Sequence, residues 1–236
     1  MLYIIQNDPE VPPGIIAEEL DLLGVERLIV HPYRGDELPA FTDVSAVIVL
    51  GGTMGANDDT KHPFLSDLKQ FIRAVVEQGR PYLGICRGGQ LLAAVFGSEV
   101  KSDTNGEKGT YSIMLTDEGL EDRLFHGIAP GFISFQWHND SFTIPREAVW
   151  LAFTETCHTQ AFRIGEKAWG LQFHPEIDGP TLDVWLKRDN KGMRQRAPHV
   201  LERLQEQRDE IVQASRALCA QLVRNLLRAA EQPSLG

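Results

Sequence analysis

Cys86 lies between Gly84 and Gly88 in a stretch that changes from strand to helix character. Residues 82–85 predict a short buried strand and residues 88–96 a helix, so the chain must turn sharply at the cysteine. Glycines on both sides allow such a corner without a collision. The thiol would then lie at a helix N-terminus, where the dipole and free N–H groups favour a thiolate and bind an oxyanion. The alternative is a small, buried, unreactive cysteine.

A nucleophilic cysteine needs a base, and His174 is the strongest candidate among seven histidines. It ends the apolar stretch 168–173, and Pro175 keeps it in extended geometry. Glu176 follows two residues later and is placed to accept a hydrogen bond from the far imidazole nitrogen, as the acid of a catalytic triad does. The alternative is a histidine at a strand end beside a surface glutamate.

Together the two motifs closely resemble those of the class I (triad) glutamine amidotransferases. That family carries Gly-x-Cys-x-Gly-x-Gln at the corner and His-Pro-Glu after a late strand, which here are residues 84–90 and 174–176. The resemblance extends to Gly51-Gly52 and to residues 137–140, Trp-His-Asn-Asp, which are similar to the glutamine-contacting segment of the GMP-synthetase-like branch. It covers residues 1–185.

Two departures from the family pattern are visible. The usual Gly-Gly-Pro is Gly51-Gly52-Thr53 here, which changes what makes the loop rigid. The segment that commonly reads Ser-His-Gly-Asp has Asn139 in the glycine position, which affects the local backbone.

The resemblance implies a mechanism and a set of catalytic roles. Cys86 would attack the side-chain amide of L-glutamine and form a γ-glutamyl thioester. His174, held by Glu176, would protonate the departing ammonia and then activate water. The backbone N–H groups of Gly52 and Arg87 would form the oxyanion hole.

The resemblance also implies that Gln90, His138 and Asp140 bind the amino-acid end of the substrate. Ordinary loop hydrogen bonding is the alternative for His138 and Asp140. For the side chain of Arg87, the alternative to a role in the site is a surface ion pair, with only its N–H taking part in the chemistry. No metal and no cofactor is expected, and Cys157 and Cys219 are assigned structural places.

Composition excludes several classes of protein. The chain has 236 residues and a net charge of −10, which disfavours binding to nucleic acid or to an anionic membrane. The three cysteines are far apart in the sequence, so we expect neither a disulfide framework nor a zinc site with thiolate ligands. No apolar run reaches membrane-spanning length, and the first residues lack a basic segment, so we expect no signal peptide and a cytoplasmic location.

The elements around these motifs predict an α/β fold. Apolar strands alternate with amphipathic helices up to residue 96, which indicates a doubly wound, mostly parallel sheet with helices on both faces. Strands are expected at 2–7, 27–31, 46–50 and 82–85, and helices at 14–23, 64–78 and 88–96. Further short strands, some of them antiparallel, are expected at 111–115, 132–136, 149–154, 160–164 and 168–173.

The last fifty residues differ from the rest of the chain. Residues 187–196 are charged, Pro198 is suited to open a helix, and apolar residues at helical spacing predict a long amphipathic helix over 200–229. We expect a domain over residues 1–185 and a helical extension over 186–236 packed on it. A partner surface or a homodimer contact is the alternative for this helix.

The sequence leaves three functions open. It has no phosphate-binding loop and no dinucleotide fingerprint, and too few residues follow Glu176 for a synthetase domain. A glutamine-hydrolysing chain would therefore pass ammonia to a separate synthetase subunit. The second possible function is that of a stand-alone hydrolase of γ-glutamyl peptides. The third is that of a non-catalytic binding module, and the presence of Cys86, His174 and Glu176 argues against it.

Overall fold

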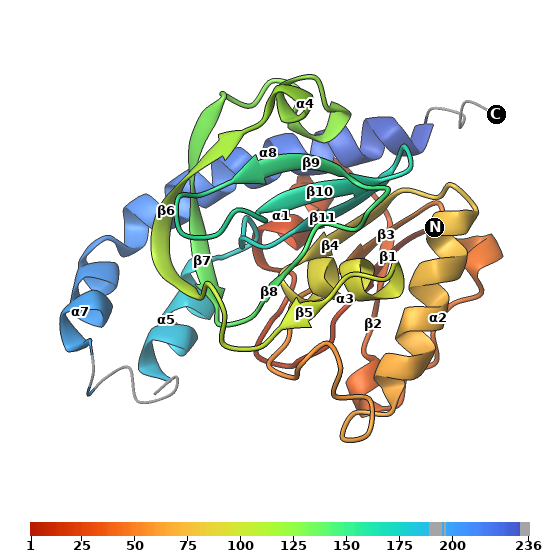
Figure 1. Cartoon of the computed structure of the whole chain (residues 1–236), viewed down its shortest axis with the longest axis horizontal. Coiled ribbons are helices and arrows are strands. Elements are labelled where there is room, and N and C mark those ends of the chain that lie inside the picture. Colours follow the sequence, from red (N-terminus) through yellow and green to blue (C-terminus); the bar gives the residue numbers. More distant parts are fainter. Residues whose placement is uncertain (189–194, 196, 232–236) are drawn as a thin grey trace.

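A mixed sheet of nine strands runs through the chain in the order β2-β1-β3-β4-β11-β10-β9-β6-β7 (Figure 1). The computed structural model describes residues 1–188, 195 and 197–231. The strands are β1 (Leu2–Ile5), β2 (Arg27–Val30), β3 (Ala46–Val49), β4 (Tyr82–Ile85), β6 (Glu107–Leu115), β7 (Gly131–His138), β9 (Val149–Phe153), β10 (Ala161–Ile164) and β11 (Ala168–Leu171). A separate antiparallel pair is formed by β5 (Val100–Lys101) and β8 (Ser141–Phe142).

Strand direction divides the large sheet into two parts. The neighbours β2, β1, β3, β4 and β11 pair in parallel, whereas β10, β9, β6 and β7 continue the sheet in antiparallel pairs. Every residue of β3 and of β4 is buried, as strands covered on both faces require. The predicted parallel sheet with added antiparallel strands is confirmed.

Helices cover both faces of this sheet. They are α1 (Gly14–Leu22), α2 (Phe64–Glu77), α3 (Arg87–Val95), the short α4 (Asp117–Leu120), α5 (Gly179–Lys187), α7 (Pro198–Glu206) and α8 (Arg208–Glu231). The apolar residues of α1, α5 and α8 join one hydrophobic cluster, and those of α2 and α3 join a second. Within the described ranges, no helix has both the length and the apolar character needed to cross a membrane.

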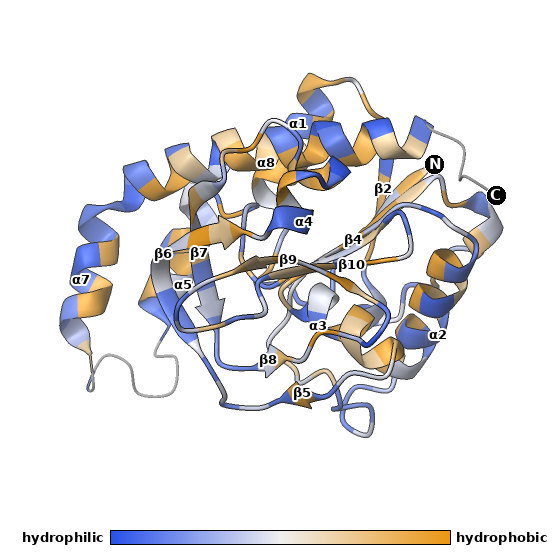
Figure 2. Cartoon of the chain, turned by 45° about the horizontal axis from the view of Figure 1, so that its top comes forward, coloured by the Kyte–Doolittle hydropathy of each residue, from blue (hydrophilic) through white to orange (hydrophobic). Residues whose placement is uncertain are grey.

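The helical C-terminal region was predicted as one element and consists of two. Pro198 stands in the first turn of α7, which ends at Glu206, and Gln207 separates it from α8. Figure 2 shows hydrophobic and hydrophilic residues following one another along α8, as expected for a helix with one buried face. Most of the charged stretch 187–196 lies outside the described residues, and α5 was not anticipated.

Helix α8 packs on α1, α5 and β7, and its polar side chains also hold the fold together. Asn225 is 2% exposed and its side-chain amide donates hydrogen bonds of 2.8 Å to the carbonyl groups of Leu124 and His126. The apolar residues of α8 belong to the same cluster as those of α1 and of the sheet. The division into domains at residue 185 stays a prediction.

Removal of a buried α8 side chain should therefore destabilise the whole fold. Leu222 is 1% exposed, so Leu222→Ala is expected to lower the free energy of unfolding by about 2–5 kcal/mol through lost burial and a cavity. Leu22→Ala, at a leucine that is 76% exposed on α1, should change it by less than about 0.5 kcal/mol. Urea unfolding followed by circular dichroism measures both, and equal effects would contradict a shared core.

Candidate active site

The carboxyl ends of four neighbouring parallel strands meet at one edge of the sheet. Asp8 follows β1, Gly52 follows β3, Cys86 follows β4 and His174 follows β11, in the spatial order of the strands. Residues far apart in sequence are thereby brought together, as is usual for ligand sites in open α/β sheets. The cysteine and the histidine of the two sequence motifs come from directly paired strands.

The backbone at Cys86 forms the sharp corner that the glycines predicted. Its φ of 50° and ψ of −104° lie in a region that side-chain-bearing residues rarely occupy. A Cβ on Gly84 would lie 2.4 Å from the carbonyl carbon of Gly88, and a Cβ on Gly88 would lie 2.0 Å from the carbonyl oxygen of Val49. Only glycine fits at these two positions, so strand, corner and helix α3 pack directly on one another.

His174 and Glu176 form a buried pair. Nδ1 of His174 donates to Oε1 of Glu176 at 2.7 Å, and each residue is 2% exposed. This bond uses Nδ1, and the buried Nε2 atom has no hydrogen-bond partner among the described residues, so Nε2 is the nitrogen available to the thiol. The N–H of Ile15, in the first turn of α1, donates to the carbonyl oxygen of Glu176 at 3.0 Å and so fixes the acid. The ring of Trp185 packs edge-on against the imidazole with 4.9 Å between centroids.

Cys86 and His174 change each other's protonation. The two side chains lie close together beside Gly51. A Cβ built on Gly51 would lie 3.4 Å from Cε1 of His174 and 3.7 Å from Cβ of Cys86. Burial raises the pKa of the Cys86 thiol, but the positive charge of His174 beside it outweighs this and sets the pKa below its ordinary value. Burial lowers the pKa of His174, but Glu176 and the thiolate raise it to about 10. The lowered pKa of the thiol and the raised pKa of the imidazole both favour a thiolate beside an imidazolium over the neutral pair.

A cavity of about 510 Å³ opens above this pair, and Gly52, Cys86, Arg87, Gln90, His138 and Asp140 all line it. The side chain of Arg87 is buried, forms an ion pair with Asp140 at 3.1 Å and donates to the side-chain oxygen of Gln90. His174 lines the cavity as well, so seven of the eight predicted site residues do. The eighth, Glu176, binds His174, and the structure thus brings all eight to one place. Their individual roles stay predictions.

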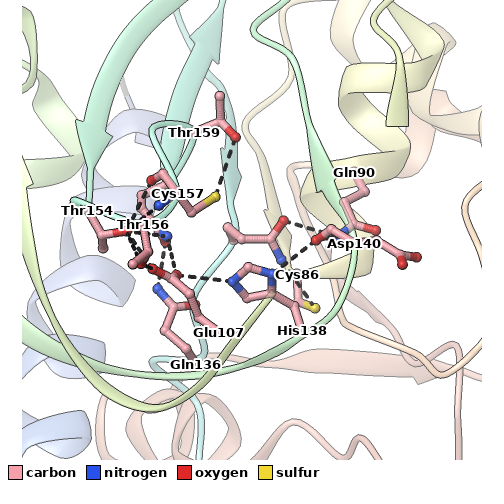
Figure 3. A network of polar contacts seen from close by, with 12 residues as sticks. Cys86, Gln90, Glu107, Gln136, His138, Asp140, Thr154, Thr156, Cys157 and Thr159 are labelled. Atoms are coloured by element: carbon pink, nitrogen blue, oxygen red, sulfur yellow. Dashed lines mark hydrogen bonds and ion pairs between the residues drawn. The ribbon is translucent and has the colours of Figure 1, made fainter. Parts of the chain in front are cut away.

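A polar network connects the cysteine through residues that line the cavity to a buried glutamate, Glu107 (Figure 3). The side-chain amide of Gln172 donates to the Cys86 sulfur at 3.7 Å and accepts from Gln90 at 3.0 Å. Gln90 and the Nδ1 atom of His138 both bind the carbonyl oxygen of Asp140, at 3.1 and 3.0 Å. Both polar ends of Gln90 are therefore used inside the protein.

Glu107 ends this network. Its carboxylate accepts from Thr154 at 2.5 Å and from Gln160 at 2.6 Å, and also from Thr156. Nε2 of His138 lies 3.2 Å from the same carboxylate. Since both ring nitrogens of His138 are engaged by protein atoms, its direct effect is to hold the Asp140 backbone in place.

A cluster with potential metal ligands lies in this network. The ligand atoms of Glu107, His138 and Cys157 are within 4.8 Å of one another. However, the Glu107 oxygens already receive four hydrogen-bond partners, and burial raises the pKa of the Cys157 thiol, so the cluster fits a hydrogen-bonded support better than a metal centre.

Comparison with known proteins identifies the family of this chain. The family model described as "Glutamine amidotransferase class-I" matches residues 15–189. One subunit of a glutamine-hydrolysing GMP synthase from Sulfurisphaera tokodaii is 29% identical over 165 residues, which are 69% of this chain and 82% of that protein. A GMP synthase of Aeropyrum pernix is 32% identical over 73% of this chain but only 33% of its own length. The chain belongs to the class I glutamine amidotransferases.

Solved structures of this family resemble the chain over nearly its whole length. A glutamine amidotransferase from Thermotoga maritima has a TM-score of 0.83 and 28% identity, and covers 98% of both chains. A glutamine amidotransferase from Methylobacillus flagellatus has a TM-score of 0.85 and 27% identity, and covers 98% of this chain and 96% of its own. The family model ends near residue 189, whereas these two structures also match the helical C-terminal region.

Several residues of this amidotransferase site were missed from the sequence. Gln172 lies two residues before His174. It is the polar residue in the otherwise apolar stretch 168–173, and this could have marked it as a site residue. Asp8 accepts from Thr53, and Glu107 holds His138, across contacts that no local pattern reveals. A surface ion pair was the alternative for Arg87, and this was wrong in its location: Arg87 is buried and pairs with Asp140 in the lining of the cavity.

The thiolate pair predicts how Cys86 reacts with iodoacetamide. Wild-type Cys86 should be alkylated at pH 7 faster than a free thiol, because its pKa is lowered. In His174→Ala the burial remains and the imidazolium is lost, so the pKa should rise and the rate at pH 7 should fall about tenfold for each unit of change. Peptide mass spectrometry across pH 5–10 measures both, with Cys157 and Cys219 as buried internal controls. Identical profiles for both proteins would contradict the pairing.

Proposed function

We propose that this chain hydrolyses the side-chain amide of L-glutamine with a Cys86-His174-Glu176 triad. One observation carries the proposal. A strained, buried cysteine at a helix N-terminus lies beside a histidine whose Nδ1 is bound by a buried glutamate. An unreactive core cysteine requires neither the corner nor the partner pair. Membership of the class I amidotransferases supports the same chemistry.

The steps follow from the positions of these groups. The Cys86 thiolate attacks the amide carbon, and the carbonyl oxygen becomes an oxyanion held by the N–H groups of Gly52 and Arg87. The imidazolium of His174 gives its proton to the nitrogen, the carbon–nitrogen bond breaks, and ammonia leaves behind a γ-glutamyl thioester. His174 then takes a proton from water, which attacks the thioester, and glutamate and the thiolate are released.

The residues at the far side of the cavity would bind the amino-acid end of glutamine. Asp140 offers a carboxylate to the α-ammonium group, and Arg87, which pairs with it, supplies the balancing charge. Gln90 and His138 would act by fixing the Asp140 backbone with their side-chain nitrogens rather than by touching the substrate. We assign all four residues to substrate binding on this basis.

An amidotransferase passes its ammonia to an acceptor, and we propose that a separate synthetase chain holds it. Two relatives that are named as one subunit of a glutamine-hydrolysing GMP synthase match this chain over 82% of their own length. This match supports a separate synthetase chain as the partner. Pairing with a second copy of the chain also stays a prediction.

A second function is favoured by the size of the cavity. A volume of about 510 Å³ falls within the range of roughly 300–1,000 Å³ that holds drug-sized ligands, so a group larger than ammonia can be accommodated. Trp185 extends the wall from His174 to Trp137, with 6.4 Å between the indole rings, and Lys108 stands over Trp137. These features support a stand-alone hydrolase of γ-glutamyl peptides, whose acyl transfer to Cys86 is the same.

Release of glutamate from glutamine and from a γ-glutamyl dipeptide separates the two functions. Wild-type protein should release glutamate from glutamine, and Cys86→Ala should lose at least about a thousandfold in kcat because the covalent step is gone. A preference for the dipeptide would identify a stand-alone hydrolase. Turnover by Cys86→Ala equal to that of the wild type would contradict both assignments, and no turnover of either substrate by the wild type would support a binding module.

A further inference from the structure

The loop that would supply one half of the oxyanion hole is tied to the end of β1. Thr53, directly after Gly52, donates to Oδ2 of Asp8 through its N–H at 3.1 Å and through its hydroxyl at 2.5 Å. Oδ1 of Asp8 accepts from the N–H of Glu10 at 2.9 Å. Asp8 is only 6% exposed, so a buried carboxylate is held by three donors, two of which belong to one residue of this loop.

The other side of the same loop is held by the residue that precedes Asp8. The side-chain amide of Asn7 donates to the carbonyl oxygen of Leu50 at 2.8 Å, and the N–H of Leu50 donates to Ile5 at 3.0 Å. Gly51 and Gly52 are therefore bracketed between Leu50 and Thr53, each of which is bound to the same short segment after β1. Two glycines in a row would otherwise have the greatest conformational freedom of any residue pair.

Thr53 occupies the position where the family usually has proline. A proline ring fixes φ and has no N–H, so it restricts the loop without needing an acceptor. Threonine has neither property, and its N–H, which is partly buried in this loop, needs a partner. Here the Asp8 carboxylate provides that partner and also takes the hydroxyl, so two hydrogen bonds can restrict the loop in place of the ring.

We infer that Asp8 is a positioning residue that acts through Thr53 to hold the Gly52 N–H where the oxyanion forms. The inference rests on the function proposed above, because it assigns the Gly52 N–H to oxyanion binding. Asp8 does not touch the substrate in this account. Its effect falls on the transition state rather than on the binding of glutamine, since the oxyanion exists only after the thiolate has attacked.

The test compares Asp8→Asn with Asp122→Asn in steady-state glutamine hydrolysis. An amide cannot accept all three hydrogen bonds, so Asp8→Asn should lower kcat about 10–100-fold while KM changes less than about threefold, a smaller loss than removal of an oxyanion donor. Asp122 is a matched control because it is 5% exposed, accepts from Leu124 and Trp169 at 2.9 and 2.8 Å, and does not line the cavity. Asp122→Asn should lose thermal stability but keep its kcat.

Two further variants separate positioning from general damage. Thr53→Val keeps the N–H and loses only the hydroxyl, so its kcat should fall by a smaller factor, about three- to tenfold. Adding Thr53→Pro to Asp8→Asn should restore most of the lost kcat, because the ring restricts the loop without the carboxylate. The rate of Cys86 alkylation should be the same in all these proteins, since the thiolate pair is not altered.

The outcomes distinguish this inference from the proposed function. Wild-type kcat in Asp8→Asn, an equal loss in Asp122→Asn, or no recovery with Thr53→Pro would each overturn the positioning role while glutamine hydrolysis by the wild type stands. A wild-type protein that hydrolyses neither glutamine nor a γ-glutamyl dipeptide would overturn the proposed function, and with it this inference.

Discussion

The corner at Cys86 is the constraint on which the rest of the site depends. A residue with a side chain is held at a φ of 50°, in a conformation that costs free energy and persists only where its surroundings determine it. The surroundings do so by close backbone contact, because Gly84 and Gly88 have no space for a Cβ. In addition, the N–H of Cys86 donates to the carbonyl oxygen of Leu171 at 2.7 Å, which ties the corner to β11.

That tie to β11 connects the corner to the histidine. Three residues after Leu171 the chain reaches His174, whose N–H donates to Phe135 of β7 at 2.8 Å. The sheet therefore fixes both members of the thiolate pair through its own hydrogen bonds, and Glu176 fixes only the ring. Preorganisation of this kind lets charged groups act in a buried site without rearrangement during the reaction.

The buried polar network of Glu107 and His138 fixes the wall of the cavity that contains Asp140. Glu107 and His138 are almost fully buried, and such groups are tolerated only when their hydrogen bonds are satisfied. Burial raises the pKa of Glu107 but its donors outweigh this and lower it, so a charged carboxylate is favoured there. The network thus fixes the backbone of Asp140 through the bonds from Gln90 and His138.

The sequence predicted the features that depend on neighbours along the chain. The corner at Cys86, the strand before His174 and the fold class follow from local spacing and apolar periodicity, and the paired parallel strands confirm them. Features that depend on distant contacts were missed. Asp8 and Thr53 are 45 residues apart, and Glu107 and Thr154 are 47 residues apart, with no local pattern to link them. The break between α7 and α8 was also missed, because the apolar spacing continues through Gln207.

The central claim is that the thiol at this corner forms an acyl bond with the substrate. Rapid acid quenching of the protein during turnover of glutamine, followed by peptide mass spectrometry, tests it most directly. The account predicts that the peptide with Cys86 gains the mass of one γ-glutamyl group and that the peptides with Cys157 and Cys219 stay unchanged. The same experiment is done on the wild type and on Glu176→Gln. Turnover without an adduct on Cys86 in both proteins would contradict the account, and so would an adduct on another residue.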